Sequence, residues 1–135
     1  ATKFAATLRD RVYNGAAGNL SKAHGKAEFS ADAADTIVHT LDMDAGFKMF
    51  GLSAIRSAMG AGTGLQVGVH YPDGDGTDDP DYFGTVADSS AAGTLTWAGS
   101  PVVFDKRVVL TVTVTGAAGT GSVDIIPEYV YIGKL

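Results

Sequence analysis

An alternation of apolar and polar residues, repeated in short segments, limits what this chain can fold into. Residues 108–115 place Leu110, Val112 and Val114 on one face and three threonines on the other. Residues 65–71 alternate in the same way. Successive side chains of a strand point to opposite faces, so a period of two residues predicts β-strands rather than helices.

Further segments share this character and are separated by residues that form turns. They are residues 33–43, 47–59, 82–87, 94–98 and 122–132. β-Branched and aromatic side chains favour strands, and the glycine, proline and aspartate between the segments favour turns. About eight short strands at regular spacing are typical of an all-β sandwich or barrel.

The segment at residues 47–59 leaves an alternative open. Its two-residue alternation favours a long strand, and Gly46, Gly51 and Gly60 would interrupt a helix. A shorter helix over residues 52–59 remains the alternative.

The two segments nearest the C-terminus lead to further expectations. We expect residues 122–132 to pair with residues 108–115 as a hairpin across the turn at 116–121. The threonine face of residues 108–115 would then be exposed to water. The face that carries Tyr129 and Tyr131 is more apolar than a solvent-facing surface requires, which indicates a partner on that side.

Charge is divided unevenly along the 135 residues. Residues 1–26 hold five basic residues against one acidic residue, a net charge of +4, whereas the remainder carries −9. Glycine and alanine are frequent up to residue 27. We therefore predict an extended basic N-terminal arm over residues 1–27 and a single β domain over residues 28–135. The arm would either order on an acidic partner surface or remain solvated.

Composition excludes several classes of protein. A net charge of −5 argues against a general nucleic-acid binder, which needs basic residues to neutralise phosphates. The chain has no cysteine, which excludes disulfides and thiolate metal sites and suits synthesis in a reducing cytosol. No apolar run approaches the ~20 residues needed to cross a bilayer, and the first residues lack the pattern of a secretory signal. We expect no nucleic-acid or membrane partner.

An acidic loop over residues 73–81 is the first candidate for chemistry. Asp73, Asp75, Thr77 and Asp79 alternate in a glycine-rich stretch, as oxygen ligands of a cation could. The closing glutamate of a calcium-binding loop is missing. Two other interpretations remain open. The simpler one is a solvated surface loop, and the other is a loop that contacts a basic surface such as a neighbouring subunit's arm.

No other pattern indicates catalysis. His24, His39 and His70 are widely separated and lack the spacing of metal ligands. No serine lies in a nucleophile motif, and residues 60–64 lack the lysine of a phosphate-binding loop, which favours a simple turn. We expect no enzymatic activity, no metal and no cofactor.

Several segments resemble small structural proteins of tailed bacteriophages. They are Asp35-Thr-Ile-Val38, residues 47–59, residues 60–68, Asp79-Pro-Asp-Tyr-Phe83, and residues 109–123 with their Gly/Ala turn. The chain resembles the jelly-roll type of capsid decoration protein, also called cement or head-stabilising protein. That resemblance implies a jelly-roll-like β-sandwich with an extended N-terminal arm. It also implies a homotrimer on the outer capsid surface of the virion, made in the host cytoplasm, that clamps neighbouring major capsid subunits.

The resemblance also suggests roles for particular residues. The expected capsid-binding residues of the arm are Lys3, Phe4, Leu8, Arg9, Arg11 and Tyr13. Tyr129 and Tyr131 would lie in the core or the oligomer interface, and Trp97 most naturally in the core. The alternative function is a fibre or adhesion module that binds a host glycan on an aromatic platform, for which Tyr71, Tyr82 and Phe83 flank the acidic loop.

Overall fold

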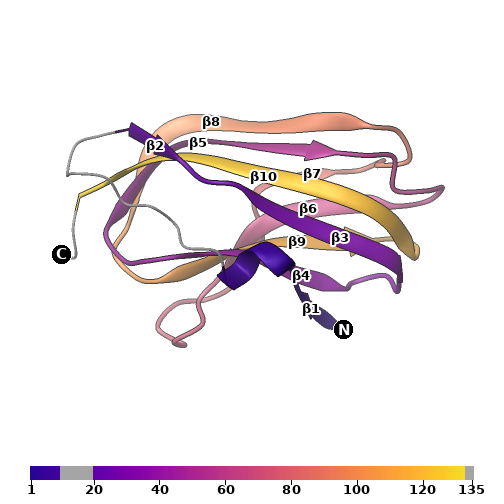
Figure 1. The fold of residues 1–135 in the computed structure, drawn as a ribbon, viewed down its shortest axis with the longest axis horizontal. Coiled ribbons are helices and arrows are strands. Elements are labelled where there is room, and N and C mark those ends of the chain that lie inside the picture. The colour runs from indigo at the N-terminus through magenta and orange to yellow at the C-terminus, as the bar shows by residue number, and fades with distance from the viewer. Residues whose placement is uncertain (10–19, 133–135) are drawn as a thin grey trace.

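The computed structural model describes residues 1–9 and 20–132, which form ten β-strands and one short 3₁₀ helix (Figure 1). The elements in chain order are β1 (Thr2–Phe4), η1 (Ala6–Arg9), β2 (Leu20–Lys22), β3 (Gly25–Asp32), β4 (Ile37–Met43), β5 (Phe47–Arg56), β6 (Gly64–His70), β7 (Asp79–Val86), β8 (Gly93–Phe104), β9 (Val108–Thr115) and β10 (Gly119–Tyr131). In these two ranges no helix has the length and apolar character needed to span a membrane.

The strands form two sheets packed face to face. Sheet A has the order β1-β4-β9-β6-β7, and sheet B has the order β2-β10-β5-β8, with β3 pairing with β10 alongside β2. Without β1 and β2, each sheet keeps four strands, β4-β9-β6-β7 and β3-β10-β5-β8. This order is that of a jelly roll, in which two Greek keys wrap around one core. The predicted all-β, jelly-roll-like sandwich is confirmed.

The core fills the space between the two sheets. Met49 and Ile125 of sheet B are fully buried, as are Leu110 and Val112 of sheet A. Burying one such side chain contributes roughly 1.5–3 kcal/mol. The inward faces of both sheets therefore supply most of the stability of the fold.

The segment at residues 47–59 forms a strand, as the alternation predicts, and ends at Arg56 rather than at residue 59. Phe47, Leu52 and Ala54 face the core. The register with β8 shifts between Met49 and Gly51, which bends the strand without ending it. The alternative helix over residues 52–59 is wrong.

The predicted hairpin between the last two strands is also wrong. β9 pairs with β4 and β6, whereas β10 pairs with β2, β3 and β5, so the two strands lie in opposite sheets. Gly116 turns the chain with a φ of 83°, and a Cβ there would lie 2.5 Å from the carbonyl oxygen of Gly62. Glycine-containing turns of this kind connect strands of two different sheets as readily as they connect the two strands of a hairpin. Each strand instead buries an apolar face against the common core from its own side.

The threonine face of β9 is buried rather than wet. Thr111 is 2% exposed and Thr113 is 5% exposed. β9 is the central strand of sheet A, so side chains of both neighbouring strands flank these threonines. Thr113 lies opposite Ile37 of β4 and Gln66 of β6.

Where it is described, the N-terminal segment is part of the two sheets, whereas the sequence predicts an extended arm separate from the β domain. β1, β2 and the first residues of β3 all fall within residues 1–27 and belong to the two sheets. The expected boundary between residues 27 and 28 therefore falls inside a strand. These residues lack a strong propensity of their own, and the edges of β4 and β10 supply the backbone partners that order them.

Candidate binding surface

The first nine residues close one side of the sandwich. β1 pairs in parallel with β4, and the Ala5 amide donates to the carbonyl oxygen of His39 at 3.1 Å. η1 lies across the open side between β3 and β4 (Figure 1). There Thr7 Oγ1 donates to the carbonyl oxygen of Thr40 at 3.1 Å and accepts from the Lys26 amide at 3.0 Å. This segment connects the edges of both sheets.

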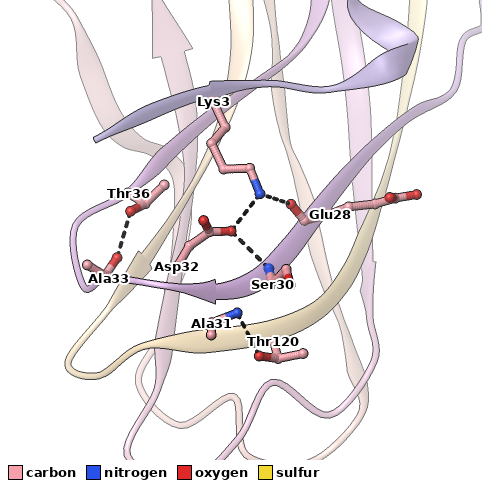
Figure 2. Close-up of polar contacts among 8 residues, drawn as sticks. All are labelled: Lys3, Glu28, Ser30, Ala31, Asp32, Ala33, Thr36 and Thr120. Carbon is pink, nitrogen blue, oxygen red and sulfur yellow. Dashed lines mark hydrogen bonds and ion pairs between the residues drawn. The ribbon is translucent and has the colours of Figure 1, made fainter.

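Lys3 holds β1 to the far sheet (Figure 2). Its Nζ lies 2.7 Å from Asp32 Oδ2 and 3.3 Å from the carbonyl oxygen of Glu28, both on β3. The Ser30 amide donates to the same carboxylate oxygen at 2.9 Å. The hydrogen bond from Lys3, together with that of the Ser30 amide, lowers the pKa of Asp32. The first predicted anchor residue therefore uses its charge within the chain.

Other basic side chains of the N-terminal segment also find acidic partners on the body. Lys22 lies 3.1 Å from Glu128, and His24 Nε2 lies 2.8 Å from Asp124 Oδ1. These pairs are largely exposed, and such pairs contribute only about 0.2–1 kcal/mol. Contacts within one molecule thus neutralise part of the basic charge of the N-terminal segment and part of the acidic charge of the body.

Phe4 is the most exposed of the large hydrophobic side chains that lie open on the described surface. Its side chain is 68% exposed, on an edge strand whose backbone is fixed by pairing with β4. The ring meets the imidazole of His39 edge-on, with centroids 5.3 Å apart. An exposed aromatic ring on an ordered strand is suited to bind another protein.

The remaining predicted anchor residues are placed less distinctively. Leu8 is half-buried in η1, and Arg9 ends that helix. Arg11 and Tyr13 lie outside the described residues, so their capsid-binding role stays a prediction.

A hollow on the outer face of sheet A brings together two histidines that the sequence does not connect. His39 of β4 and His70 of β6 meet above the central strand β9, with ring centroids 4.8 Å apart. The hollow has a volume of about 260 Å³ and also includes Thr111 and Asp78. Thr111 lies opposite His39 in the register, which explains why the threonine is buried. No spacing in the sequence signals this contact, because β4 and β6 are joined only through β9.

The ionisable side chains in this hollow change one another's pKa values. Burial lowers the pKa of His39, and the neighbouring His70 lowers it further, while Asp78 acts in the opposite direction. His70 Nδ1 lies 2.6 Å from Asp78 Oδ2, and the Tyr71 amide donates to Asp78 Oδ1 at 2.9 Å. Burial raises the pKa of Asp78, but these two hydrogen bonds outweigh it and the net pKa is lowered. The arrangement favours a neutral His39 beside an ionised Asp78.

The acidic loop is tied to the body by basic side chains. Asp73 Oδ1 lies 3.3 Å from Arg107 Nη1, and the carbonyl oxygen of Asp75 accepts from Lys106 Nζ at 2.6 Å. A hydrogen bond with the Asp81 side chain raises the pKa of Asp79. Within residues 1–9 and 20–132, no three acidic or histidine side chains are placed to share an ion. The weak cation candidate at Asp73, Asp75, Thr77 and Asp79 therefore gains no support from this geometry.

The two tyrosines proposed for an oligomer interface lie in different environments. Tyr129 is fully buried in the core, edge-on to Phe47 at 6.3 Å, and burial raises its pKa. It is a core residue, one of the two roles left open by the sequence. Tyr131 is half-buried and lines a second hollow of about 400 Å³ with Asp44, Arg107 and other charged residues.

The aromatic residues beside the acidic loop pack inward rather than forming a platform. Phe83 is 3% exposed and meets Trp97 edge-on at 5.2 Å. Tyr82 and Tyr71 are half-buried against the core. A glycan site needs open aromatic faces, so this cluster does not favour the adhesion alternative. The contact with Phe83 places Trp97 against the core, as expected.

The fold defines the class of this protein as a two-sheet jelly-roll sandwich with an added parallel strand at one edge. No protein-family model and no curated protein matches the sequence. Among solved structures, the chain is similar to one in the capsid of Ralstonia phage GP4, with a TM-score of 0.74 and 15% identity over 100% of both chains. It is also similar to a chain of the Helicobacter pylori bacteriophage KHP30 capsid, with a TM-score of 0.63 and 15% identity over 87% of this chain and 91% of that one. A chain of the Cyanophage Pam1 capsid gives a TM-score of 0.60 and 16% identity over 91% and 94%. At these identities the likeness is one of fold.

Proposed function

We propose that this chain is a non-enzymatic structural protein of a phage virion that binds the outer capsid surface. The observation that carries the proposal is the shared fold, which extends over the whole of a chain in one phage capsid and most of a chain in two others. In this proposal the protein acts as a homotrimer. It stabilises the head by clamping neighbouring major capsid subunits.

The exposed N-terminal edge supplies the contact chemistry for this role. Phe4 is 68% exposed on a backbone that pairing with β4 already holds in place, so little backbone entropy is lost when it binds. Lys3 positions β1 through Asp32 and does not need to reach the capsid. We assign the charged contacts to Arg9 and Arg11, the latter in the part of the chain that the structure does not describe.

Three copies in a trimer would present three such edges at once. Linked binding sites raise the effective concentration of each other, so modest contacts add up to tight attachment. Tyr131, half-buried at the end of β10, remains the candidate for contacts between copies. Tyr129 supports this surface from inside the core.

A point substitution tests the anchor better than a truncation. Deleting residues 1–13 would also remove β1 and η1, which close the sandwich, and a loss of binding could then reflect unfolding. Phe4→Ser changes an exposed side chain and should leave the fold intact. Phe50→Ser is the matched control, because Phe50 is also an exposed phenylalanine, at 37%, but lies in sheet B.

The measurement is occupancy on expanded, undecorated heads of the same phage, by co-sedimentation and by cryo-electron microscopy. We expect wild type and Phe50→Ser to fill the threefold positions and Phe4→Ser to lose at least ten-fold in affinity. A loss of about 1.4 kcal/mol corresponds to ten-fold. Bare heads with saturating wild-type protein would contradict the proposed function. Full binding of Phe4→Ser would contradict only the anchor.

A further inference from the structure

The edge of sheet B formed by β8 differs from the other three sheet edges. β1 is three residues long and carries Lys3, and β7 begins with the sequence Asp79-Pro-Asp81. The β2–β3 edge holds two lysines and two acidic residues. Short length, charge and proline are the devices that prevent a sheet edge from pairing with another chain. β8 is twelve residues long and contains no charged residue, and its one proline, Pro101, lies beyond the stretch up to Ala98 that pairs with β5 in unbroken register.

The uncharged character extends beyond the strand. From residue 89 to residue 104 the sequence has no charged side chain, although the chain as a whole carries −5. Ile55 on the adjacent strand β5 and Val103 on β8 itself are 43% and 41% exposed. These are two of the six large hydrophobic side chains that lie open on the described surface. Among the described strands, only β5 pairs with β8, so its outer backbone groups have no partner strand.

We infer that β8 is a self-association edge, which pairs antiparallel with β8 of a second copy and joins two copies of sheet B into one continuous sheet. The electrostatics favour a second copy as the occupant. Two bodies that each carry −5 repel one another, and β8 itself brings no charge into the contact. The nearest basic side chains of β5, Lys48 and Arg56, lie opposite its two ends, at Val103 and Gly93.

The register of β8 also suits pairing with itself. The straight part of the strand runs to Ala98, before the register with β5 shifts. In an antiparallel pair centred on Thr96, each Leu95 lies opposite Trp97 of the other copy. Both side chains are only half-buried in the single chain. Pairing would cover them on the inner face, while small polar residues meet on the outer face.

This contact is distinct from the proposed trimer and does not depend on it. A twofold contact uses the same surface on both copies and cannot by itself close a ring of three. On a capsid it would connect one trimer to the next. In solution it produces assemblies with an even number of chains.

The first test is sedimentation equilibrium of the full chain, with and without a charge on the edge. Thr96→Lys should halve the mass of the assembly, whether from dimer to monomer or from hexamer to trimer. Thr85→Lys places the same charge on the exposed edge strand β7 and should leave the mass unchanged. Raising the salt concentration should strengthen the wild-type association, because it screens the repulsion. Circular dichroism establishes that both variants are folded.

The second test uses the absence of cysteine from the natural chain. Thr96→Cys should form a disulfide-linked dimer under mild oxidation, since directly opposite residues lie within the ~4.4–6.8 Å between Cα atoms that a disulfide needs. Thr85→Cys should not. A wild-type chain that is monomeric at all concentrations, or an assembly unchanged by Thr96→Lys, would overturn the inference. So would an assembly in which Thr96→Cys gives no cross-link.

Discussion

Two threonines of sheet A, Thr40 and Thr113, are almost equally buried but differ in what their hydroxyl groups contact. Thr40 Oγ1 donates to the carbonyl oxygen of Leu110 at 2.8 Å. In the described part of the chain, Thr113 Oγ1 is the buried side-chain oxygen that lacks a hydrogen-bond partner. A buried hydroxyl without a partner costs free energy, whereas a satisfied one contributes modestly.

Replacing each threonine by valine should therefore change stability in opposite directions. We expect Thr113→Val to raise the free energy of unfolding by about 1–3 kcal/mol, because it removes an unsatisfied group at nearly constant volume. Thr40→Val should lower it by about 0.5–1.5 kcal/mol. Urea unfolding followed by circular dichroism measures both. Destabilisation by Thr113→Val would show that its hydroxyl is satisfied in solution.

At the scale of elements, β1 depends on one side chain for its link to the other sheet. Backbone hydrogen bonds join β1 to β4, but the link to β3 in sheet B includes the ion pair between Lys3 and Asp32. The pair is partly shielded, with side chains 39% and 19% exposed. Its loss should loosen the N-terminal edge without unfolding the domain.

Hydrogen exchange can detect this loosening. In Lys3→Met we expect the Ala5 amide, which donates to His39, to exchange about two- to five-fold faster, as the loss of an ion pair worth about 0.5–1 kcal/mol implies. Lys22→Met is the control, because it breaks a more exposed pair on β2. That variant should leave the Ala5 rate unchanged. Equal protection of the Ala5 amide in the wild type and in both variants would contradict the proposal that Lys3 holds β1 to β3.

Local patterns in the sequence predict most of the strands but not which of their side chains are buried. The alternation at residues 47–59 and 108–115 is a property of neighbouring residues, so β5 and β9 could be predicted. Burial of Thr111 and Thr113 depends on side chains from strands that are distant in sequence. The three N-terminal strands were missed for a related reason. Their order comes from partners in β4 and β10 rather than from their own residues.

The candidate surface was predicted in part. The excess of basic residues drew attention to Lys3 and Phe4, and both lie on the edge strand β1. Charge alone could not show that Lys3 is satisfied within the chain while Phe4 is exposed. That difference depends on which face of β1 meets β3. The contact between His39 and His70 has no signal in the sequence.

At the scale of the whole molecule, the pairing of strands is almost entirely non-local. Among the described strands, β6 and β7 are the one pair of partners that are consecutive in the chain. Each other pairing closes a long loop before it gains any contact, which costs entropy early in folding. Proteins dominated by such pairings fold slowly for their size.

We therefore expect refolding in milliseconds to seconds rather than microseconds. Trp97 is the single tryptophan and packs against Phe83 across the two sheets, so its fluorescence reports their docking. Stopped-flow dilution from urea measures the rate. Equilibrium unfolding by fluorescence and circular dichroism should coincide if the transition is two-state. Complete refolding within the dead time would contradict the expectation.

The tie between β1 and β3 has a mechanical consequence. A pull on the exposed ring of Phe4 enters sheet A through the backbone of β1 and β4. The same pull reaches sheet B through Lys3 and Asp32, one residue away (Figure 2). Tension at a single point on the surface is thereby shared between both layers of the sandwich. Neither layer could then be peeled from the other at that edge without breaking the ion pair first.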